Sequence, residues 1–405
     1  MRRWYHKMEP ESKRILLFST AFRPMIGGSE IAMEEICRRL PEISFDLITA
    51  RFSRANKKTE QVGNIKVHRL GLGFKFDKYL LPILGFFKAR SLAGNGGLFA
   101  PATAGKDRHC YGVYSRLHAY QASYGAIAAY LVKIFDPNVS LITTLQEGKE
   151  LDSQGALLKM MRGLVIKKSD KITAISNYLA EFARKLNKKA TIIVIPNGVD
   201  SDLFKKLDFE GSEMKSRLNI REDERIVMTV SRLVPKNGVD VLIKAFARLD
   251  EVIGNLKTRL VIIGSGPMAD ELESLTVELG VSDRIIFAGD IYYEDLPGYL
   301  SMADVFARPS YSEGLGDAFL EAMAVGVPII GTRVGGIVDF LEDGVTGLFC
   351  GVGDHEDLAK KIKMVLSDVD LRRRLIENGR ELAKNKYSWQ SISEKFQEIY
   401  NFIPN

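Results

Sequence analysis

Short apolar segments rich in β-branched residues recur along the chain and alternate with stretches of helical periodicity. They cover residues 15–20, 45–50, 65–70, 139–144, 171–176 and 191–195 in the first half, and 225–231, 259–264, 284–289, 304–309, 328–332 and 347–350 in the second. Most are apolar throughout, which is typical of strands buried on both faces of a parallel sheet. The alternation predicts an α/β protein with two Rossmann-like, doubly wound parallel sheets built from right-handed βαβ units.

The chain length and one turn signal indicate how the chain divides. Its 405 residues exceed what one core usually holds and favour two domains. The PNGVD sequence at 196–200 is a turn signal, and a polar stretch follows it. We therefore expect a first domain over residues 1–200 and a second over 201–386. The remaining segment, 387–405, contains an amphipathic helix with Trp389, Ile392, Phe396, Ile399 and Tyr400 on one face.

The overall composition is that of an ordinary globular protein. Apolar residues make up 46% and charged residues 27%, which excludes a mostly disordered chain, a collagen-like chain and a disulfide-stapled mini-protein. Cys37, Cys110 and Cys350 form no C-x-x-C pair, so we expect buried free thiols in a reducing compartment. No apolar run is long enough for a transmembrane helix or a signal peptide, and the sequence predicts a cytoplasmic protein.

Charge is divided unevenly between the two halves. Residues 1–195 hold 32 Lys and Arg against 16 Asp and Glu, a net charge of +16, whereas residues 196–405 hold 25 against 35, a net charge of −10. A basic half suits an anionic partner such as nucleic acid, acidic phospholipid or a phosphorylated substrate, although attraction between the halves explains the split equally well. The chain carries no nucleic-acid-binding motif, so nucleic acid is not expected.

The region 71–112 does not fit the alternating pattern. It contains the apolar run 79–87 and a Gly-rich stretch at 91–105, and it is too long for a plain loop. The run is flanked by Lys75, Lys78, Lys88 and Arg90. Two interpretations stay open: shallow docking of the basic first domain on an anionic membrane surface, and packing of a loop on its own domain.

Two short motifs at predicted strand ends could bind an anion. Gly27 and Gly28 precede a helical pattern, where backbone N–H groups and the helix dipole favour negative charge, although a tight turn is as good an explanation. Arg232 and Lys236 follow the strand at 225–231 closely enough to act together. They could neutralise a diphosphate, or they could belong to a solvated turn.

A third motif favours a different enzyme class. The sequence GSGPMA at 264–269 matches G-x-G-x-x-A, with Gly264 and Gly266 after a strand and before a helix. Asp290 ends the next strand, about where a ribose-binding acid would lie. This pattern is the argument for an NAD(P)-dependent oxidoreductase, although glycines are common at strand-to-helix turns.

The segment 307–332 carries the most chemistry. Glu313 precedes the turn Gly314–Gly316, and Glu321 follows eight residues after Glu313, on the next helix. The loop could offer N–H groups to an anion while the carboxylates accept hydrogen bonds from hydroxyls. A nucleotide diphosphate-sugar presents both kinds of group. Paired carboxylates also occur in glycoside hydrolysis and on plain solvated helices.

Taken in order, seven motifs resemble family 4 retaining glycosyltransferases, whose two Rossmann-like domains face each other across a cleft in the GT-B fold. The motifs are GGSE, TAISNYL, VIPNGVD, SRLVPKNGVD, VIIGSGP, SEGLGDAFLEAMAVGVPII and TRVGGIVDFLEDGVTG. Together they span nearly the whole chain. The sixth contains the family's Glu, seven residues, Glu signature.

The resemblance implies a role for each matching residue. Arg232 and Lys236 would neutralise the diphosphate of a UDP- or GDP-sugar, and Glu321 would accept from its ribose. Glu313, with the N–H groups of Gly314 and Leu315, would hold the sugar and distal phosphate. The residues assigned to the donor are Gly27, Gly28, Arg232, Lys236, Gly264, Gly266, Glu313, Gly314, Leu315, Gly316 and Glu321. The first domain would bind a glycan, glycolipid or phosphorylated acceptor, and the last helix would cross back to it.

Three positions depart from the family pattern or extend it. The family commonly has its lysine where this chain has Asn237, so Lys236 is expected to reach the diphosphate instead. Gln146 stands where the family often has a histidine. His118 stands where the family often has a functional histidine near the acceptor, and it is included with Glu313, Arg232 and Lys236 as a catalytic candidate, although a structural histidine is an equal interpretation.

The expected reaction transfers a sugar to an acceptor hydroxyl with retention of the anomeric configuration. No Asp-x-Asp stretch is placed to hold a metal, so no metal and no resident cofactor are expected. A nucleotide-sugar epimerase, an NAD(P)-dependent oxidoreductase and an inactive binding protein stay open as alternatives.

Overall fold

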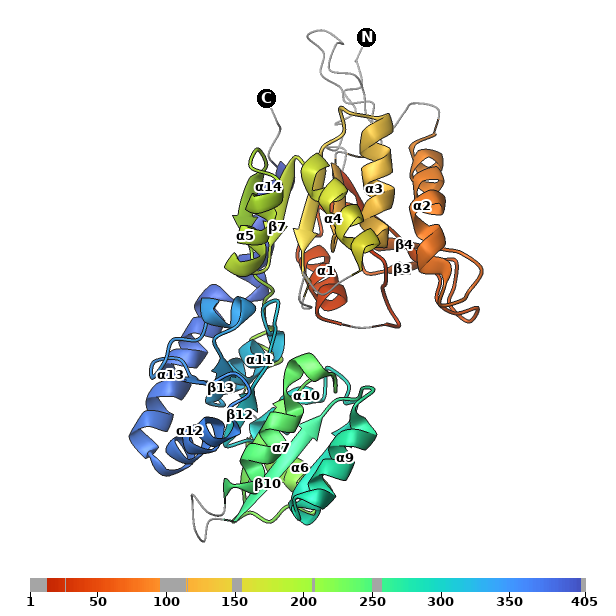
Figure 1. Ribbon diagram of the computed structural model, residues 1–405. Coiled ribbons are helices and arrows are strands. Elements are labelled where there is room, and N and C mark those ends of the chain that lie inside the picture. The colour runs from red at the N-terminus through yellow and green to blue at the C-terminus, as the bar shows by residue number, and fades with distance from the viewer. Residues whose placement is uncertain are drawn as a thin grey trace, which may run out of the picture.

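Two β-sheets with helices on both faces make up the protein. The computed structural model describes residues 13–25, 27–94, 114, 116–147, 155–205, 208–249 and 257–401. The two sheets lie in separate halves of the molecule, with their loop-bearing edges turned toward each other (Figure 1).

The first sheet has eight strands in the order β3-β4-β2-β1-β5-β6-β7-β8. The strands are β1 (Lys13–Phe18), β2 (Ile43–Ala50), β3 (Thr59–Val62), β4 (Ile65–Leu70), β5 (Arg116–Tyr120), β6 (Leu141–Leu145), β7 (Lys171–Ala174) and β8 (Thr191–Val194). The helices are α1 (Gly28–Arg38), α2 (Asp77–Ala93), α3 (Tyr124–Phe135), α4 (Ala156–Lys168) and α5 (Asn177–Leu186). All neighbouring strands pair in parallel except β3 and β4. The sequence prediction missed β3, a short edge strand whose side chains are all at least partly exposed.

The second sheet has six strands, all parallel, in the order β11-β10-β9-β12-β13-β14. The strands are β9 (Arg225–Val230), β10 (Thr258–Ile263), β11 (Ile285–Gly289), β12 (Val305–Arg308), β13 (Ile329–Thr332) and β14 (Leu348–Cys350). The α-helices are α6 (Asp208–Arg217), α7 (Val239–Ala247), α9 (Ala269–Glu278), α10 (Leu296–Ser301), α11 (Asp317–Val325), α12 (His355–Ser367), α13 (Val369–Lys386) and α14 (Trp389–Asn401). Short 3-10 turns are η2 (Pro235–Asn237), η3 (Ser282–Arg284) and η4 (Gly335–Asp339).

Burial on both faces explains why the strands read as continuous apolar runs. In β1, Ile15 and Leu17 belong to one core cluster, whereas Leu16 and Phe18 belong to the cluster on the opposite face of the sheet. Successive side chains of a strand point to opposite faces, so in a strand covered by helices on both sides most positions on each face are apolar. The predicted α/β fold with two parallel sheets is therefore confirmed.

The last helix joins the two halves of the molecule. Helix α13 packs on α11 and α12 of the second domain, and α14 packs on α1 of the first (Figure 1). The apolar face of α14 enters the first-domain core through Trp389, Ile392, Phe396, Ile399 and Tyr400. The chain therefore passes from the second domain back to the first, and α14 connects the two. The domain bounds given above stay a prediction.

The sequence suggested that the region 71–112 is irregular, but part of it is helical. Residues 77–93 form α2, which packs on α3, and residues 95–112 lie outside the described part of the chain. Cys37 and Cys350 are buried free thiols as expected, while Cys110 also lies outside the described residues. Among the helices of the described ranges, none combines the length and apolar character needed to cross a bilayer.

Candidate active site

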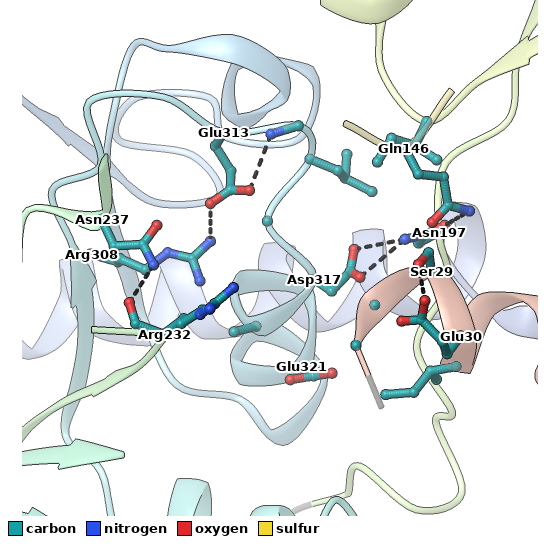
Figure 2. Close-up of a pocket in the computed structure, with 18 of the residues that line it drawn as sticks. Ser29, Glu30, Gln146, Asn197, Arg232, Asn237, Arg308, Glu313, Asp317 and Glu321 are labelled. Atoms are coloured by element: carbon teal, nitrogen blue, oxygen red, sulfur yellow. Dashed lines mark hydrogen bonds and ion pairs between the residues drawn. The ribbon is translucent and has the colours of Figure 1, made fainter. Parts of the chain in front are cut away.

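A cavity of about 860 Å³ lies where the carboxyl-end loops of the two sheets meet. The first sheet contributes the start of α1 and residues from the ends of β5, β6 and β8, and the second contributes the loops after β9 and β12 and the start of α11. Figure 2 shows the second-domain residues Arg232, Arg308 and Glu313 on one side and Glu30 and Asn197 on the other. Ligands of open α/β sheets bind at this edge, so the cavity is the candidate active site.

Glu313 is held by cations on one wall of the cavity. The Arg308 Nη2 atom donates to Glu313 Oε2 at 2.8 Å, and the Lys236 Nζ atom lies 3.6 Å from the same oxygen. The Gly314 N–H donates to Glu313 Oε1 at 3.1 Å. These contacts fix the Glu313 carboxylate at the cavity surface, and Lys236 lines the same cavity.

Arg308 is a site residue that the sequence analysis missed. Its side chain is only 7% exposed, donates to the Val230 carbonyl oxygen and lies over the Phe319 ring. It ends β12, so it stands where an apolar strand meets the cavity. A charged residue closing a fully buried strand is the sequence signal that could have identified it, because such a charge needs a partner.

Arg232 is placed differently from the other two cations. Its side chain is exposed in the cavity, and within the described ranges it has no carboxylate partner. Asn237, at the position of the family lysine, also lines the cavity but is buried, and its Nδ2 atom donates to the Arg232 carbonyl oxygen at 2.7 Å. Asn237 thus holds the loop that carries both Arg232 and Lys236.

Glycines let the loop around Glu313 pack tightly against its neighbours. Gly316 has a φ of +103°, a backbone conformation that favours glycine. A Cβ at Gly335 would lie 1.7 Å from the Glu313 carbonyl oxygen, and one at Gly336 would lie 2.2 Å from that of Gly314. The TRVGG sequence therefore supports the Glu313 loop from behind and leaves its front facing the cavity.

Glu321 and Asp317 project from α11 at the boundary between the two walls. Burial, reinforced by the charge of Asp317, raises the pKa of Glu321 to about 8. Burial also raises the pKa of Asp317 to about 6, although the hydrogen bond from Asn197 opposes that change. Asp317 accepts from Asn197, and both carboxyls line the cavity, where the hydroxyl groups of a ligand would donate to them. Asp317 is a second site residue that the sequence analysis missed.

The first-domain wall begins at Gly27 and Gly28, at the start of α1. A Cβ at Gly28 would lie 2.4 Å from Asp317 Oδ2, so the two walls approach each other closely here. Asn197 Nδ2 donates to Asp317 Oδ2 at 3.0 Å across the same boundary. The PNGVD turn, read from the sequence as a domain junction, is therefore also part of the cavity.

His118 does not reach the cavity, which corrects its assignment as a catalytic candidate. Its ring is fully buried in the centre of β5, and burial lowers its pKa to about 3. Its Nδ1 atom pairs with the Tyr400 hydroxyl and its Nε2 atom with the Thr144 hydroxyl, each at 2.6 Å. Both nitrogens are thus engaged in linking β5 to β6 and α14, and the residue is structural.

Gly264 and Gly266 also lie away from the cavity surface, contrary to their assignment to the donor. A Cβ at Gly264 would lie 2.1 Å from the Ser231 carbonyl oxygen, and one at Gly266 would lie 2.2 Å from that of Leu233. The glycines allow this loop to pack beneath the Arg232 loop. Of the GSGP sequence only Pro267 lines the cavity.

Of the other residues assigned to the donor, Gly27, Gly28, Arg232, Lys236, Glu313, Gly314, Leu315, Gly316 and Glu321 all line the one cavity. Their individual roles stay predictions. Over the residues that the structure describes, no group of three or more His, Cys, Asp or Glu side chains is arranged to hold a metal ion.

Comparison with known proteins agrees with this geometry. Residues 211–382 match the family described as Glycosyl transferases group 1. The chain is 31% identical over 288 residues to N-acetyl-alpha-D-glucosaminyl L-malate synthase of Bacillus anthracis, covering 70% of this chain and 74% of that protein. It is 32% identical to the GDP-mannose-dependent alpha-(1-6)-phosphatidylinositol monomannoside mannosyltransferase of Mycolicibacterium smegmatis, covering 57% of this chain and 62% of that protein.

Solved structures share the whole fold. Sucrose-phosphate synthase from Thermosynechococcus elongatus has a TM-score of 0.80 at 23% identity and covers 96% of this chain and 98% of its own. Anabaena HepE in complex with UDP-glucose has a TM-score of 0.76 at 18% identity, and the match covers 95% of this chain and 98% of HepE. Two sheets of mainly parallel strands, with a cavity between their loop edges, define the GT-B fold that these structures share. The chain belongs to the glycosyl transferases group 1 family.

Proposed function

We propose that this glycosyltransferase moves a sugar from a UDP- or GDP-sugar to an acceptor hydroxyl with retention of configuration, in the family 4 manner, during glycolipid or polysaccharide synthesis. The observation that carries the proposal is the convergence of Arg232, Lys236, the Glu313 loop and Glu321 on one cavity. The names of similar proteins support it, since one is a GDP-mannose-dependent mannosyltransferase and another was solved with UDP-glucose.

The wall around Arg232 suits the charge that develops during such a transfer. As the bond between the sugar and the diphosphate breaks, negative charge accumulates on the leaving group. Arg232 and Lys236, with the N–H groups after Glu313, would stabilise that charge more in the transition state than in the ground state. The leaving phosphate oxygen would take the acceptor proton on the same face, and no nucleophile or metal from the protein enters the scheme.

The oxidoreductase interpretation of GSGPMA is not favoured. A dinucleotide fingerprint needs its glycines open to a pyrophosphate, whereas backbone carbonyls of the Arg232 loop lie against Gly264 and Gly266. A nucleotide-sugar epimerase would use the same donor site as a glycosyltransferase. These two activities are distinguished by whether an acceptor becomes glycosylated.

We expect a UDP- or GDP-sugar to raise the melting temperature and nicotinamide dinucleotides to leave it unchanged. A ligand that binds the native state stabilises it in proportion to its concentration over Kd, so a thermal-shift screen of UDP-, GDP- and ADP-sugars identifies the donor. NMR of the product's anomeric proton then reports retention or inversion. Stabilisation by NADH or NADPH with no response to any nucleotide-sugar would contradict the proposal.

The exposed face of α2 supports membrane contact by the first domain. One face of α2 is buried and carries an apolar or small residue at every fourth position: Leu81, Gly85, Ala89 and Ala93. Helix α2 packs on α3, where a Cβ at Gly85 would lie 2.8 Å from the Cβ atom of Ala128. Large apolar side chains occupy the remaining surface and are exposed: Phe76 47%, Tyr79 58%, Leu80 38%, Ile83 60%, Leu84 38% and Phe87 62%. A globular protein rarely leaves so many apolar side chains uncovered on one helix.

The positive charge near this face of α2 favours an anionic lipid surface as its binding partner. Lys75, Lys78, Lys88 and Arg90 surround the apolar residues, and the nearby Asp77 is buried, accepting the Gly73 and Phe74 N–H groups. Helix α2 follows the carboxyl end of β4, the same sheet edge from which α1 enters the cavity. A membrane on this face would hold a lipid-linked acceptor near the active site.

We expect the protein to sediment with vesicles containing phosphatidylglycerol and to remain in the supernatant with phosphatidylcholine vesicles. Each basic residue near an anionic surface contributes about 1 kcal/mol, and the attraction weakens with salt. Exchanging Ile83 and Phe87 together for aspartate is expected to lower the bound fraction at least tenfold. Val277→Asp, on an exposed position of α9, is the matched control. Equal sedimentation with both lipids, or with neither, would remove the membrane proposal.

A further inference from the structure

The two walls of the cavity differ in charge. The described lining residues of the first domain include the polar side chains Ser29, Glu30, Gln121, Gln146 and Asn197, but no Lys, Arg or His. All three cations among the described lining residues, Arg232, Lys236 and Arg308, come from the second domain. The net charge of +16 in the first 195 residues is therefore not directed into the described part of the cavity.

Hydrogen bonds on the first-domain wall run toward carboxylates. Gln121 Nε2 donates to Ser29 Oγ, and Ser29 Oγ donates to Glu30 Oε1, both at 2.9 Å. A second chain runs from Gln146 Nε2 to Asn197 Oδ1 at 3.2 Å, and from Asn197 Nδ2 to Asp317 Oδ2 at 3.0 Å (Figure 2). Each chain begins at a carboxamide donor and ends at an acceptor that has lone pairs left.

The two terminal carboxylates, those of Glu30 and Asp317, are half-buried and line the cavity. Burial raises the pKa of both carboxyls, although Asp317 accepts from Asn197, and Glu30 accepts from Ser29 and from backbone N–H groups at the start of α1. A second anion placed against them would add repulsion in a region of low dielectric. A ligand hydroxyl would instead donate to a free carboxylate oxygen and satisfy it.

We propose that this wall, with Glu30 and the facing Asp317 of the second domain, is an acceptor subsite for an uncharged polyhydroxyl group such as an unmodified sugar ring, and that it excludes a phosphate or carboxylate on that ring. The inference rests on the proposed function and narrows its acceptor class. Non-reacting hydroxyls donate to Glu30 and Asp317. The reacting hydroxyl oxygen bonds to the donor's anomeric carbon, whose bond to the diphosphate oxygen breaks, and its proton passes to that leaving oxygen.

The test uses saturation-transfer NMR with UDP or GDP, whichever binds, held at saturation. The probes are methyl glucoside, methyl mannoside and methyl galactoside, each paired with its 6-phosphate, and methyl glucuronide. The uncharged glycosides are expected to show saturation at least fivefold above their charged counterparts. Glu30→Gln is expected to reduce the signal of the uncharged glycosides at least threefold. Larger saturation of the charged probes, or no saturation of any uncharged glycoside, would overturn the proposal.

A matched variant and a separate readout keep the result interpretable. Glu34 lies on the same helix, is outside the cavity lining and pairs with Arg23, so Glu34→Gln controls for loss of a carboxylate from α1. Calorimetric titration of the nucleotide into Glu30→Gln shows whether the variant is folded and binds donor. If no nucleotide binds the wild type, the proposed function fails. If nucleotide binds and Glu30→Gln behaves like Glu34→Gln in the NMR experiment, only the acceptor inference fails.

Discussion

Replacing Arg232 with alanine is expected to lower kcat by about 10²–10³-fold with the correct donor, the usual loss when one preorganised group that stabilises a developing charge is removed. Arg232 is exposed in the cavity and, among the described residues, has no carboxylate partner, so its guanidinium is available to the leaving diphosphate. Because that stabilisation acts mainly in the transition state, KM for the donor should change much less than kcat. Steady-state kinetics over a range of donor concentrations measure the two separately.

Two further variants define what the Arg232 result means. Arg232→Lys keeps the charge but loses the planar pair of donors, so it should recover only part of the rate. Arg248→Ala removes an arginine of the same domain that pairs with Glu356 far from the cavity lining, and it should leave turnover unchanged. Wild-type turnover in Arg232→Ala would show that the diphosphate is bound elsewhere and would remove the central assumption of the proposed mechanism.

The fold could be predicted from the sequence because burial on both faces leaves a local signature. In strands such as β1 and β10 the last four residues are all apolar, and that pattern does not depend on which residues pack against the strand. The edge strand β3 escaped detection because exposed edge residues carry no such pattern. Helix α2 was missed because its outer face is apolar too, so the usual helical alternation of apolar and polar positions is absent.

Site residues could be predicted from the sequence only where their place in the loop after a strand brings them to the cavity. Glu313 and Arg232 stand at loops after strands, which brings them to one sheet edge whatever the details of packing. Arg308 pairs with Glu313 across a turn, and Asp317 accepts from Asn197 of the other domain, and neither pairing follows from the order of strands and loops. His118 and Gly264 show the converse, since residue types common in active sites also serve buried hydrogen bonds and close backbone packing.

Replacing Arg308 with methionine is expected to destabilise the second domain and to abolish donor binding. The pair between Arg308 and Glu313 is largely buried, with side chains 7% and 12% exposed. Removing one partner of such a pair costs about 3–5 kcal/mol because the other charge remains desolvated. Lys236 and the Gly314 N–H still contact Glu313, so the lower value is expected, equivalent to a fall of roughly 6–12 °C in Tm for a domain of this size.

The double variant separates stability from function. Arg308→Met combined with Glu313→Gln removes the orphaned charge, and a carboxamide still accepts the Gly314 N–H, so most of the lost Tm should return while donor binding stays absent. Arg225→Met, which breaks an exposed pair with Asp304, should change Tm by no more than about 2–4 °C, as expected for roughly 1 kcal/mol. If the double variant were as unstable as Arg308→Met, the loss would come from the contacts of Arg308 with Val230 and Phe319. The ion pair would then position Glu313 for the donor without stabilising the domain.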